Sequence, residues 1–201
     1  ISSMYFNDKE EIKINNVNIL LMRGHLENLE QVSEIINEGL TRNKNILILA
    51  EDFNESLNQE IFLYYSQAKK NIFLFKIPDY GSRKEAIFQD LSTITNSNIK
   101  NIDYELVCNS NLGFSQSVLI QKDKVIIVNE NKNLDNYINK LKDKLKDNYN
   151  DYENDFVKSR IAKLEKGMAT IYVGGITKTE IKEKIMRIED ALNALERSSN
   201  G

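Results

Sequence analysis

The 201-residue sequence contains only one cysteine, one histidine and one proline. The lone cysteine, Cys108, cannot form an internal disulfide and fits a reducing compartment or an organelle matrix. With His25 as the single histidine, the sequence also argues against a zinc site, which needs about four such ligands. The scarcity of proline, beside many Asn and Lys residues, indicates AT-biased coding, which speaks to origin rather than to activity.

Long apolar runs and a large excess of one charge are missing as well. No apolar run approaches the roughly 20 residues of a membrane-spanning helix, and residues 1–6 lack the features of a signal peptide. The 27 basic and 30 acidic residues give a net charge of -3, with no segment basic enough to follow a phosphate backbone. We therefore expect no membrane and no nucleic-acid partner. The chain begins without Met, and we expect it to be a piece of a longer protein.

Apolar residues make up 41% of the chain and are spread along its length, which is typical of a globular protein. The length predicts one main domain plus, at most, a small appendage. In the first half, short apolar runs alternate with amphipathic stretches, a pattern typical of a parallel sheet flanked by helices. The expected strands cover 19–22, 45–50 and 71–76, and the expected helices 26–40, 55–68 and 83–95.

The second half adds mixed elements to this α/β pattern. The spacing of apolar residues predicts a hairpin-like strand pair, 118–121 and 125–128, two charged amphipathic helices, 134–150 and 152–164, and a strand, 168–173. A capping-box pattern from Thr177 to Glu180 predicts a last helix that runs to about Arg197. The fold class expected is therefore α/β, with a parallel-sheet core flanked by helices and a small strand-helix segment at the end.

Three segments carry a resemblance to a known family. Residues 76–91, Lys-Ile-Pro-Asp-Tyr-Gly-Ser-Arg-Lys-Glu-Ala-Ile-Phe-Gln-Asp-Leu, resemble the Lys-Ala-Pro-Gly-Phe-Gly-Asp-Arg-Arg-Lys-Ala-Met-Leu-Gln-Asp-Ile signature of group I chaperonins, the GroEL type. Residues 160–164, Arg-Ile-Ala-Lys-Leu, and 187–192, Arg-Ile-Glu-Asp-Ala-Leu, are similar to the family's Arg-Val-Ala-Lys-Leu and Arg-Val-Glu-Asp-Ala-Leu stretches. The matches follow one another in the family's order along the chain.

The resemblance implies a domain assignment and an activity. Residues 1–166 would form the apical domain, and 167–201 the returning C-terminal part of the intermediate domain. The implied function is that of a molecular chaperone, which captures non-native polypeptides and a GroES-type co-chaperonin within an ATP-driven, homo-oligomeric heptameric ring. The equatorial domain of the family, with its phosphate-binding loop, has no counterpart here. ATP and Mg²⁺ would belong to the full-length parent, so we expect no cofactor and no ATPase activity in this chain.

The resemblance also suggests where the protein works. Group I chaperonins occur in bacterial cytoplasm, mitochondria and plastids. Combined with the AT-biased composition, this predicts the organelle matrix, in a plastid or mitochondrion, of an AT-rich eukaryote. The alternative is bacterial cytoplasm.

A protein that captures unfolded chains needs an exposed apolar surface with little sequence preference. Alignment places the family's two groove helices at about 33–42 and 56–67. The positions expected to bind substrate or co-chaperonin are Tyr5, Phe6, Ile36, Phe62 and Leu63, with Leu40 and Leu57 as further candidates. Ser33 and Asn58 stand where the family has leucine, which leaves open a groove too polar to bind anything.

The same periodicity has a structural explanation, because an amphipathic helix beside a sheet usually buries its apolar stripe. Periodicity alone does not separate a binding surface from a core. The apolar run 61–65 is wider than one buried face requires, so we expect part of it to point away from the core.

Two further roles rest on the resemblance. Asp190 matches the family's catalytic aspartate, which in the full-length parent would act on the water that attacks ATP; an ordinary solvated helix carboxylate is the alternative. Gly167 matches a hinge glycine, and Lys166 stands where the family usually has a second one. A glycine that ends a helix explains Gly167 equally well, and both explanations are compatible.

An α/β enzyme domain that binds a small ligand or a nucleotide is the rival function. Glu51 and Asp52 end a predicted strand, where an acid pair binds Mg²⁺ in some enzymes, but no third acid accompanies them. We favour a capping or loop role for this pair and expect no metal site. The pair Gly174-Gly175 lacks the rest of a dinucleotide fingerprint, and neither His25 nor Cys108 has a partner that would make a nucleophile.

Overall fold

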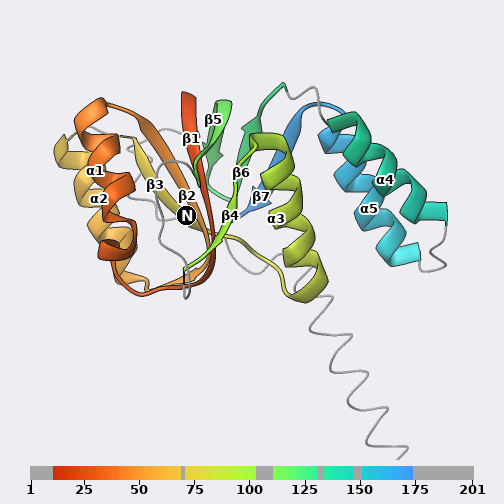
Figure 1. The fold of residues 1–201 in the computed structure, drawn as a ribbon, viewed down its shortest axis with the longest axis horizontal. Coiled ribbons are helices and arrows are strands. Elements are labelled where there is room, and N and C mark those ends of the chain that lie inside the picture. Colours follow the sequence, from red (N-terminus) through yellow and green to blue (C-terminus); the bar gives the residue numbers. More distant parts are fainter. Residues whose placement is uncertain (1–10, 69–70, 103–110, 131–133, 147–150, 174–201) are drawn as a thin grey trace, which may run out of the picture.

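The computed structural model describes residues 11–68, 71–102, 111–130, 134–146 and 151–173 (Figure 1). The strands are β1 (Glu11–Leu26), β2 (Asn45–Phe53), β3 (Ile72–Lys76), β4 (Ile99–Asn101), β5 (Gly113–Gln121), β6 (Lys124–Val128) and β7 (Met168–Tyr172). The helices are the short 3-10 helix η2 (Leu29–Val32), α1 (Ser33–Arg42), α2 (Ser56–Ala68), α3 (Gly81–Thr95), α4 (Leu134–Lys146) and α5 (Asp151–Leu164). Within these ranges, every helix is too short or too polar to span a bilayer.

One mixed sheet forms the centre of the molecule (Figure 1), with the strand order β3-β2-β1-β5-β6-β7. The pairs β1–β2, β2–β3 and β1–β4 are parallel, whereas β1–β5, β5–β6 and β6–β7 are antiparallel. Strand β1 belongs to both the parallel and the antiparallel half of the sheet, because its first part pairs antiparallel with β5 and its residues Leu21 to Arg23 pair parallel with β4. The expected α/β fold with helices around a parallel-sheet core is confirmed, and an antiparallel half extends it.

Side chains of β1 alternate between two hydrophobic cores, one on each face of the sheet. Ile19 and Leu21 lie in the first, which we call the α3-side core, and Leu20 and Met22 lie in the second, the α1/α2-side core. From the helices, the α3-side core includes Phe88, Leu91, Ile94, Leu134, Ile138, Leu141, Ile161 and Leu164. The α1/α2-side core includes Ile35, Ile36, Leu57 and Ile61. Burial on both faces explains the continuous apolar runs of the central strands.

Most predicted elements of the described ranges are present, and several differ in extent; β5, for example, begins at Gly113 rather than at 118. β1 has 16 residues rather than the four of its apolar run. The apolar run does not show the first part of the strand, because one face of that part is exposed: Ile14 and Val17 are buried, whereas Lys13 and Asn15 are exposed. The expected helix 26–40 is divided, since Asn28 caps η2 in a capping box with Gln31 before α1 begins. The predicted hairpin is the antiparallel pair β5–β6.

The strand that follows Gly167 belongs to the same sheet. β7 pairs antiparallel with β6 at the sheet edge, and Ala169 and Ile171 lie in the α3-side core. Residues 174–201, which include the predicted last helix, lie outside the described residues. The boundary between residues 166 and 167 therefore stays a prediction.

Candidate functional site

The binding positions predicted on α1 and α2 differ widely in exposure. Ile36 and Leu57 are only 3% and 2% exposed and belong to the α1/α2-side core. The expectation that Ile36 is presented to water is wrong, and Leu57 follows the alternative of a core residue, because the stripe that carries them covers β2 and β3. Leu40 is partly buried against the same core, and Phe62 is partly buried against the α3-side core.

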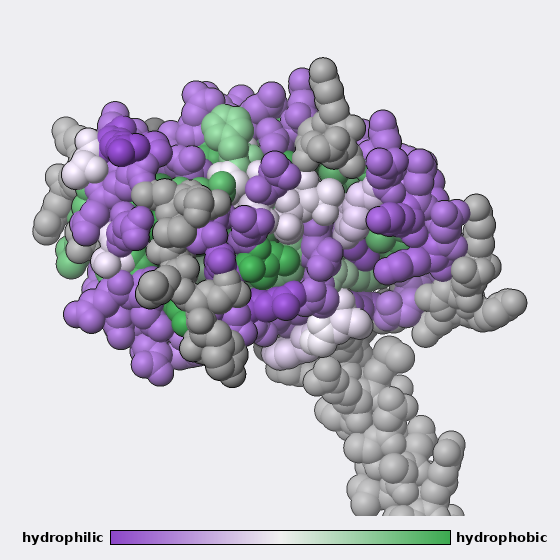
Figure 2. Space-filling view, viewed as in Figure 1, coloured by the Kyte–Doolittle hydropathy of each residue, from purple (hydrophilic) through white to green (hydrophobic). Residues whose placement is uncertain are grey.

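Leu63 is the predicted position that the structure leaves in water, with 51% of its surface exposed. Its neighbour Ile61 is fully buried, so the wide apolar run of α2 points in two directions, as expected. The other exposed residues of α1 and of the first part of α2 are polar or charged: Ser33, Glu34, Asn37, Thr41, Arg42, Ser56, Gln59 and Glu60. Figure 2 shows one face of the molecule as mostly hydrophilic, with small separate hydrophobic patches.

Three predicted site residues, Tyr5, Phe6 and Asp190, lie outside the described residues. Among the described residues of α1 and α2, the apolar side chains that are at least partly exposed are Leu63, Phe62 and Leu40. A binding role for these positions stays a prediction.

Gly167 lies in the turn that follows α5 and has a left-handed conformation, with φ of 64°. Its N–H donates to the carbonyl oxygen of Leu164 at 2.8 Å, and its own carbonyl accepts from Asn129 N at 3.0 Å. An added Cβ would lie 2.9 Å from the carbonyl oxygen of Asn129. The turn therefore accounts for this glycine by itself, and the hinge role stays a prediction.

The acid pair Glu51 and Asp52 lies at the carboxyl end of β2, beside a hollow of about 440 Å³. This end of a parallel sheet is where α/β proteins commonly bind ligands. Here the acids already have cationic partners: Asp52 pairs with Lys76 and His25, and Glu51 lies 3.7 Å from Lys84 Nζ. The hydrogen bond from Lys76, aided by that from His25, lowers the pKa of Asp52 to about 2. Among the described residues, no group of three His, Cys, Asp or Glu side chains is arranged to hold a metal ion.

His25 lies between two acceptors at the strand ends. Its Nδ1 is 3.0 Å from Asp52 Oδ2, and its Nε2 is 3.0 Å from Asn54 Oδ1. The Asn54 amide is held in this orientation because its Nδ2 donates to the carbonyl oxygen of Glu27 at 2.8 Å. Both ring nitrogens must then donate, which favours the imidazolium. The hydrogen bond to Asn54, followed by that to Asp52, raises the pKa of His25 above 6.5.

We expect the Asn54→Ala variant to lower the pKa of His25, because one of the two acceptors is lost. As the only histidine, His25 gives resolved ring signals in a proton NMR titration. Its raised pKa contributes stability that is present below the unfolded-state pKa and is lost as the pH rises through the folded-state value. Asn37→Ala, on the outer face of α1, is the control and should leave the titration unchanged. A wild-type pKa at or below 6.5 would contradict the assignment.

The two described segments that carry the family resemblance meet in a buried ion pair. Arg160 of α5 donates to both carboxylate oxygens of Asp90 of α3, with Nε–Oδ2 and Nη2–Oδ1 distances of 2.7 Å. The Tyr137 hydroxyl of α4 donates to Asp90 Oδ1 and accepts from Arg160 Nη2, both at 2.9 Å. The Arg160 and Asp90 side chains are 12% and 11% exposed.

This triad of Asp90, Tyr137 and Arg160 joins three helices. Burial, with the nearby charge of Asp90, raises the pKa of the Tyr137 hydroxyl, so it stays protonated and able to donate. Burial opposes the charge on Arg160, but the hydrogen bonds and charge of Asp90 prevail and raise the pKa of the guanidinium. Asp90 stands among the core residues Phe88, Leu91 and Ile94 of α3, and a carboxylate among such apolar positions is a sequence signal for a buried cationic partner.

Comparisons with known proteins identify a similar fold. No family model matches the sequence. The structure is similar to the crystal structure of the chaperonin gp146 from the bacteriophage EL 2 (Pseudomonas aeruginosa), in the presence of ATP-BeFx, with a TM-score of 0.56 and 16% identity. The match covers 92% of this chain and 38% of that chain, so the present chain spans well under half of the chaperonin's length.

Proposed function

We propose that the chain is the polypeptide-handling part of a group I, GroEL-type chaperonin subunit. The observation that carries this proposal is the buried pair of Asp90 and Arg160. It joins the segment 76–91 to the segment 160–164, both of which resemble the family in sequence, within a fold similar to that of a chaperonin. In this proposal, residues 1–166 act as the apical domain, while ATP, Mg²⁺ and most ring contacts belong to the rest of the parent protein, in an organelle matrix.

The capture surface in this proposal is the outer side of α1 and α2. Non-native polypeptides differ from folded proteins mainly in their exposed apolar groups, which Leu63 and the exposed parts of Phe62 and Leu40 are able to contact. Tyr5 and Phe6 are proposed to add to the same surface. The other exposed residues of these helices, such as Ser33 and Glu34, are polar, so the apolar area available for each single contact is small. Repetition of the surface around a heptameric ring would strengthen binding through multivalency.

The Leu63→Ser variant is expected to bind a urea-denatured model protein about fivefold more weakly than the wild-type chain. The reason is the loss of about 1 kcal/mol of apolar contact from a half-exposed leucine. Binding is measured by surface plasmon resonance against the immobilised denatured protein. Phe114→Ser is the matched control, because Phe114 is 45% exposed on β5 and lies outside α1 and α2.

Competition separates this proposal from its rivals. A peptide from the mobile loop of a GroES-type co-chaperonin should displace the denatured protein, whereas ATP should not. Equal binding by the wild-type and Leu63→Ser chains would contradict the capture surface. Tight binding of ATP, with no binding of denatured protein, would instead favour the α/β enzyme domain considered from the sequence.

A further inference from the structure

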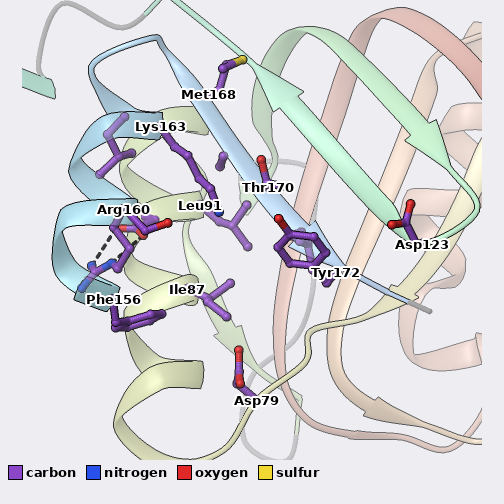
Figure 3. A pocket seen from close by; sticks show the side chains of 15 residues that line it. Asp79, Ile87, Leu91, Asp123, Phe156, Arg160, Lys163, Met168, Thr170 and Tyr172 are labelled. Atoms are coloured by element: carbon purple, nitrogen blue, oxygen red, sulfur yellow. Dashed lines mark hydrogen bonds and ion pairs between the residues drawn. The ribbon is translucent and has the colours of Figure 1, made fainter. Parts of the chain in front are cut away.

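A cleft of about 590 Å³ lies between α3, α5 and β7 (Figure 3). It is on the side of the sheet that carries the α3-side core, opposite the α1/α2-side core. Its size lies within the range of sites that take drug-sized molecules. Ile87 and Leu91 of α3 and Phe156 of α5 give it apolar walls, and the exposed Tyr172 of β7 lies at its edge.

Lys163 brings a positive charge into this apolar space. In Figure 3 its side chain extends from α5 toward β7, and its Nζ lies 5.4 Å from the centroid of the Tyr172 ring. Among the described residues, no carboxylate forms an ion pair with it, because the nearby Asp90 is held by Arg160. Burial lowers the pKa of Lys163, which means that its ammonium has lost part of its hydration. A ligand carboxylate would restore that lost stabilisation.

The charges around the cleft limit how many anionic groups a ligand carries. Four further charged residues line the cleft: Asp79, Asp90, Asp123 and Arg160. Asp90 and Arg160 pair with each other, whereas in Figure 3 Asp79 and Asp123 lie on the lower and right-hand sides of the cleft, away from the Lys163 ammonium. A second anionic group directed toward either of them would be repelled. The Tyr172 ring, which faces Lys163, offers a flat surface for an aromatic body.

We propose that the cleft between α3, α5 and β7 binds small organic monocarboxylates with a flat apolar body. The carboxylate pairs with Lys163, and the body lies against Tyr172, Ile87 and Leu91. This site is independent of polypeptide capture, since it shares no residue with Leu40, Phe62 or Leu63.

The test uses three ligands that share one ring system: 2-naphthoate, its neutral carboxamide and naphthalene-2,6-dicarboxylate. Affinities for the 201-residue chain are measured by ligand-observed NMR. We expect 2-naphthoate to bind about tenfold more tightly than the carboxamide, as a charge-assisted hydrogen bond predicts. The dicarboxylate should bind more weakly than 2-naphthoate because of Asp79 and Asp123.

Variants assign the effect to the cleft. Lys163→Met, which keeps an unbranched side chain but removes its charge, should remove most of the difference between 2-naphthoate and the carboxamide. Lys166→Met makes the same change of charge at an exposed position and should leave that difference intact. Tyr172→Leu should weaken both ligands while keeping the preference for the carboxylate. Leu63→Ser, which tests the capture surface, should change none of these affinities.

Equal affinity for 2-naphthoate and its carboxamide would overturn the proposal, as would absence of 2-naphthoate binding at millimolar concentration. An unchanged preference in Lys163→Met, in a variant whose thermal unfolding matches the wild type, would also overturn it. If that variant fails to fold, chemical-shift changes of the Tyr172 ring on adding 2-naphthoate to the wild-type chain decide the matter. Their absence then counts against the site.

Discussion

The Arg160→Ala variant is expected to lower the free energy of unfolding by about 3–5 kcal/mol. Removing one partner of a largely buried ion pair leaves the other charge without its partner in a site where it has lost most of its hydration. Of its side-chain donors in the described part of the chain, the carboxylate of Asp90 would keep the Tyr137 hydroxyl and lose both contacts with Arg160. For a chain of this size, the loss corresponds to a melting temperature lower by roughly 10 °C. Thermal and urea unfolding followed by circular dichroism measure the change.

Arg42→Ala provides the control for this prediction. Arg42 pairs with Glu38 at 3.2 Å on α1, but its side chain is 70% exposed, so the same substitution should change stability by at most about 0.5 kcal/mol. Similar losses in the two variants would show that the triad adds nothing beyond a surface pair. The Asp90→Asn variant extends the test, because an amide keeps the shape of the carboxylate while losing its charge.

Gly113→Ala is expected to cost about 1–3 kcal/mol, because the start of β5 has no room for a methyl group. An added Cβ would lie 2.6 Å from the carbonyl oxygen of Thr95 and 2.7 Å from the backbone nitrogen of Ser97. Backbone atoms at the end of α3 and in the following turn would have to move. The free energy of unfolding from urea titration measures the cost.

Gly39→Ala is the comparison for Gly113→Ala, because its added methyl group would meet a side chain rather than backbone atoms. Its Cβ would meet Ile46 Cδ1 at 2.4 Å, which is the end of a side chain that is able to rotate. The higher helix propensity of alanine, by about 1 kcal/mol, also offsets the cost within α1. We expect a smaller loss than for Gly113→Ala, and the reverse order would contradict this explanation.

The sequence predicts the buried parts of the fold better than the half-exposed ones. β2 and β3 are continuous apolar runs because both of their faces are covered, and such runs are easily recognised. The first part of β1 alternates polar and apolar residues, and its apolar positions Ile12, Ile14 and Val17 are too few to distinguish it from a loop. The three-residue strand β4 has no pattern of its own and exists because β1 offers it an edge.

The candidate site was harder to predict. The periodicity of apolar residues shows which face of a helix is apolar, but not whether that face is buried or exposed. Ile36 and Leu57 repeat at helical spacing whether the stripe faces water or a sheet, and the structure places them against the sheet. The width of the apolar run 61–65 predicted that part of it is exposed, without saying which part, and the structure shows Leu63 exposed and Ile61 buried.

The triad of Asp90, Tyr137 and Arg160 shows a different limit of prediction from the sequence. Asp90 stands out among the apolar positions of α3, but its partner is 70 residues away along the chain. Nothing in the spacing of the 27 basic residues selects Arg160 from the others. The packing of α5 against α3 brings Arg160 to Asp90, and the resulting ion pair joins the two segments that resemble chaperonins.

Burial of β2 on both faces has a consequence for the register of this strand in the sheet. A shift of β2 by one residue would exchange Ile46 and Ile48 with Leu47 and Leu49, and apolar side chains would still face apolar surroundings. The pattern of apolar and polar residues alone therefore does not fix the register of β2. The alignment is instead marked at its start by Asn45, whose side chain donates to the carbonyl oxygen of Asn15 at 2.7 Å and accepts from Asn71 Nδ2 at 2.9 Å. These hydrogen bonds link β1, β2 and the residue just before β3, and they mark the register at the start of β2 with polar contacts that a shift would break.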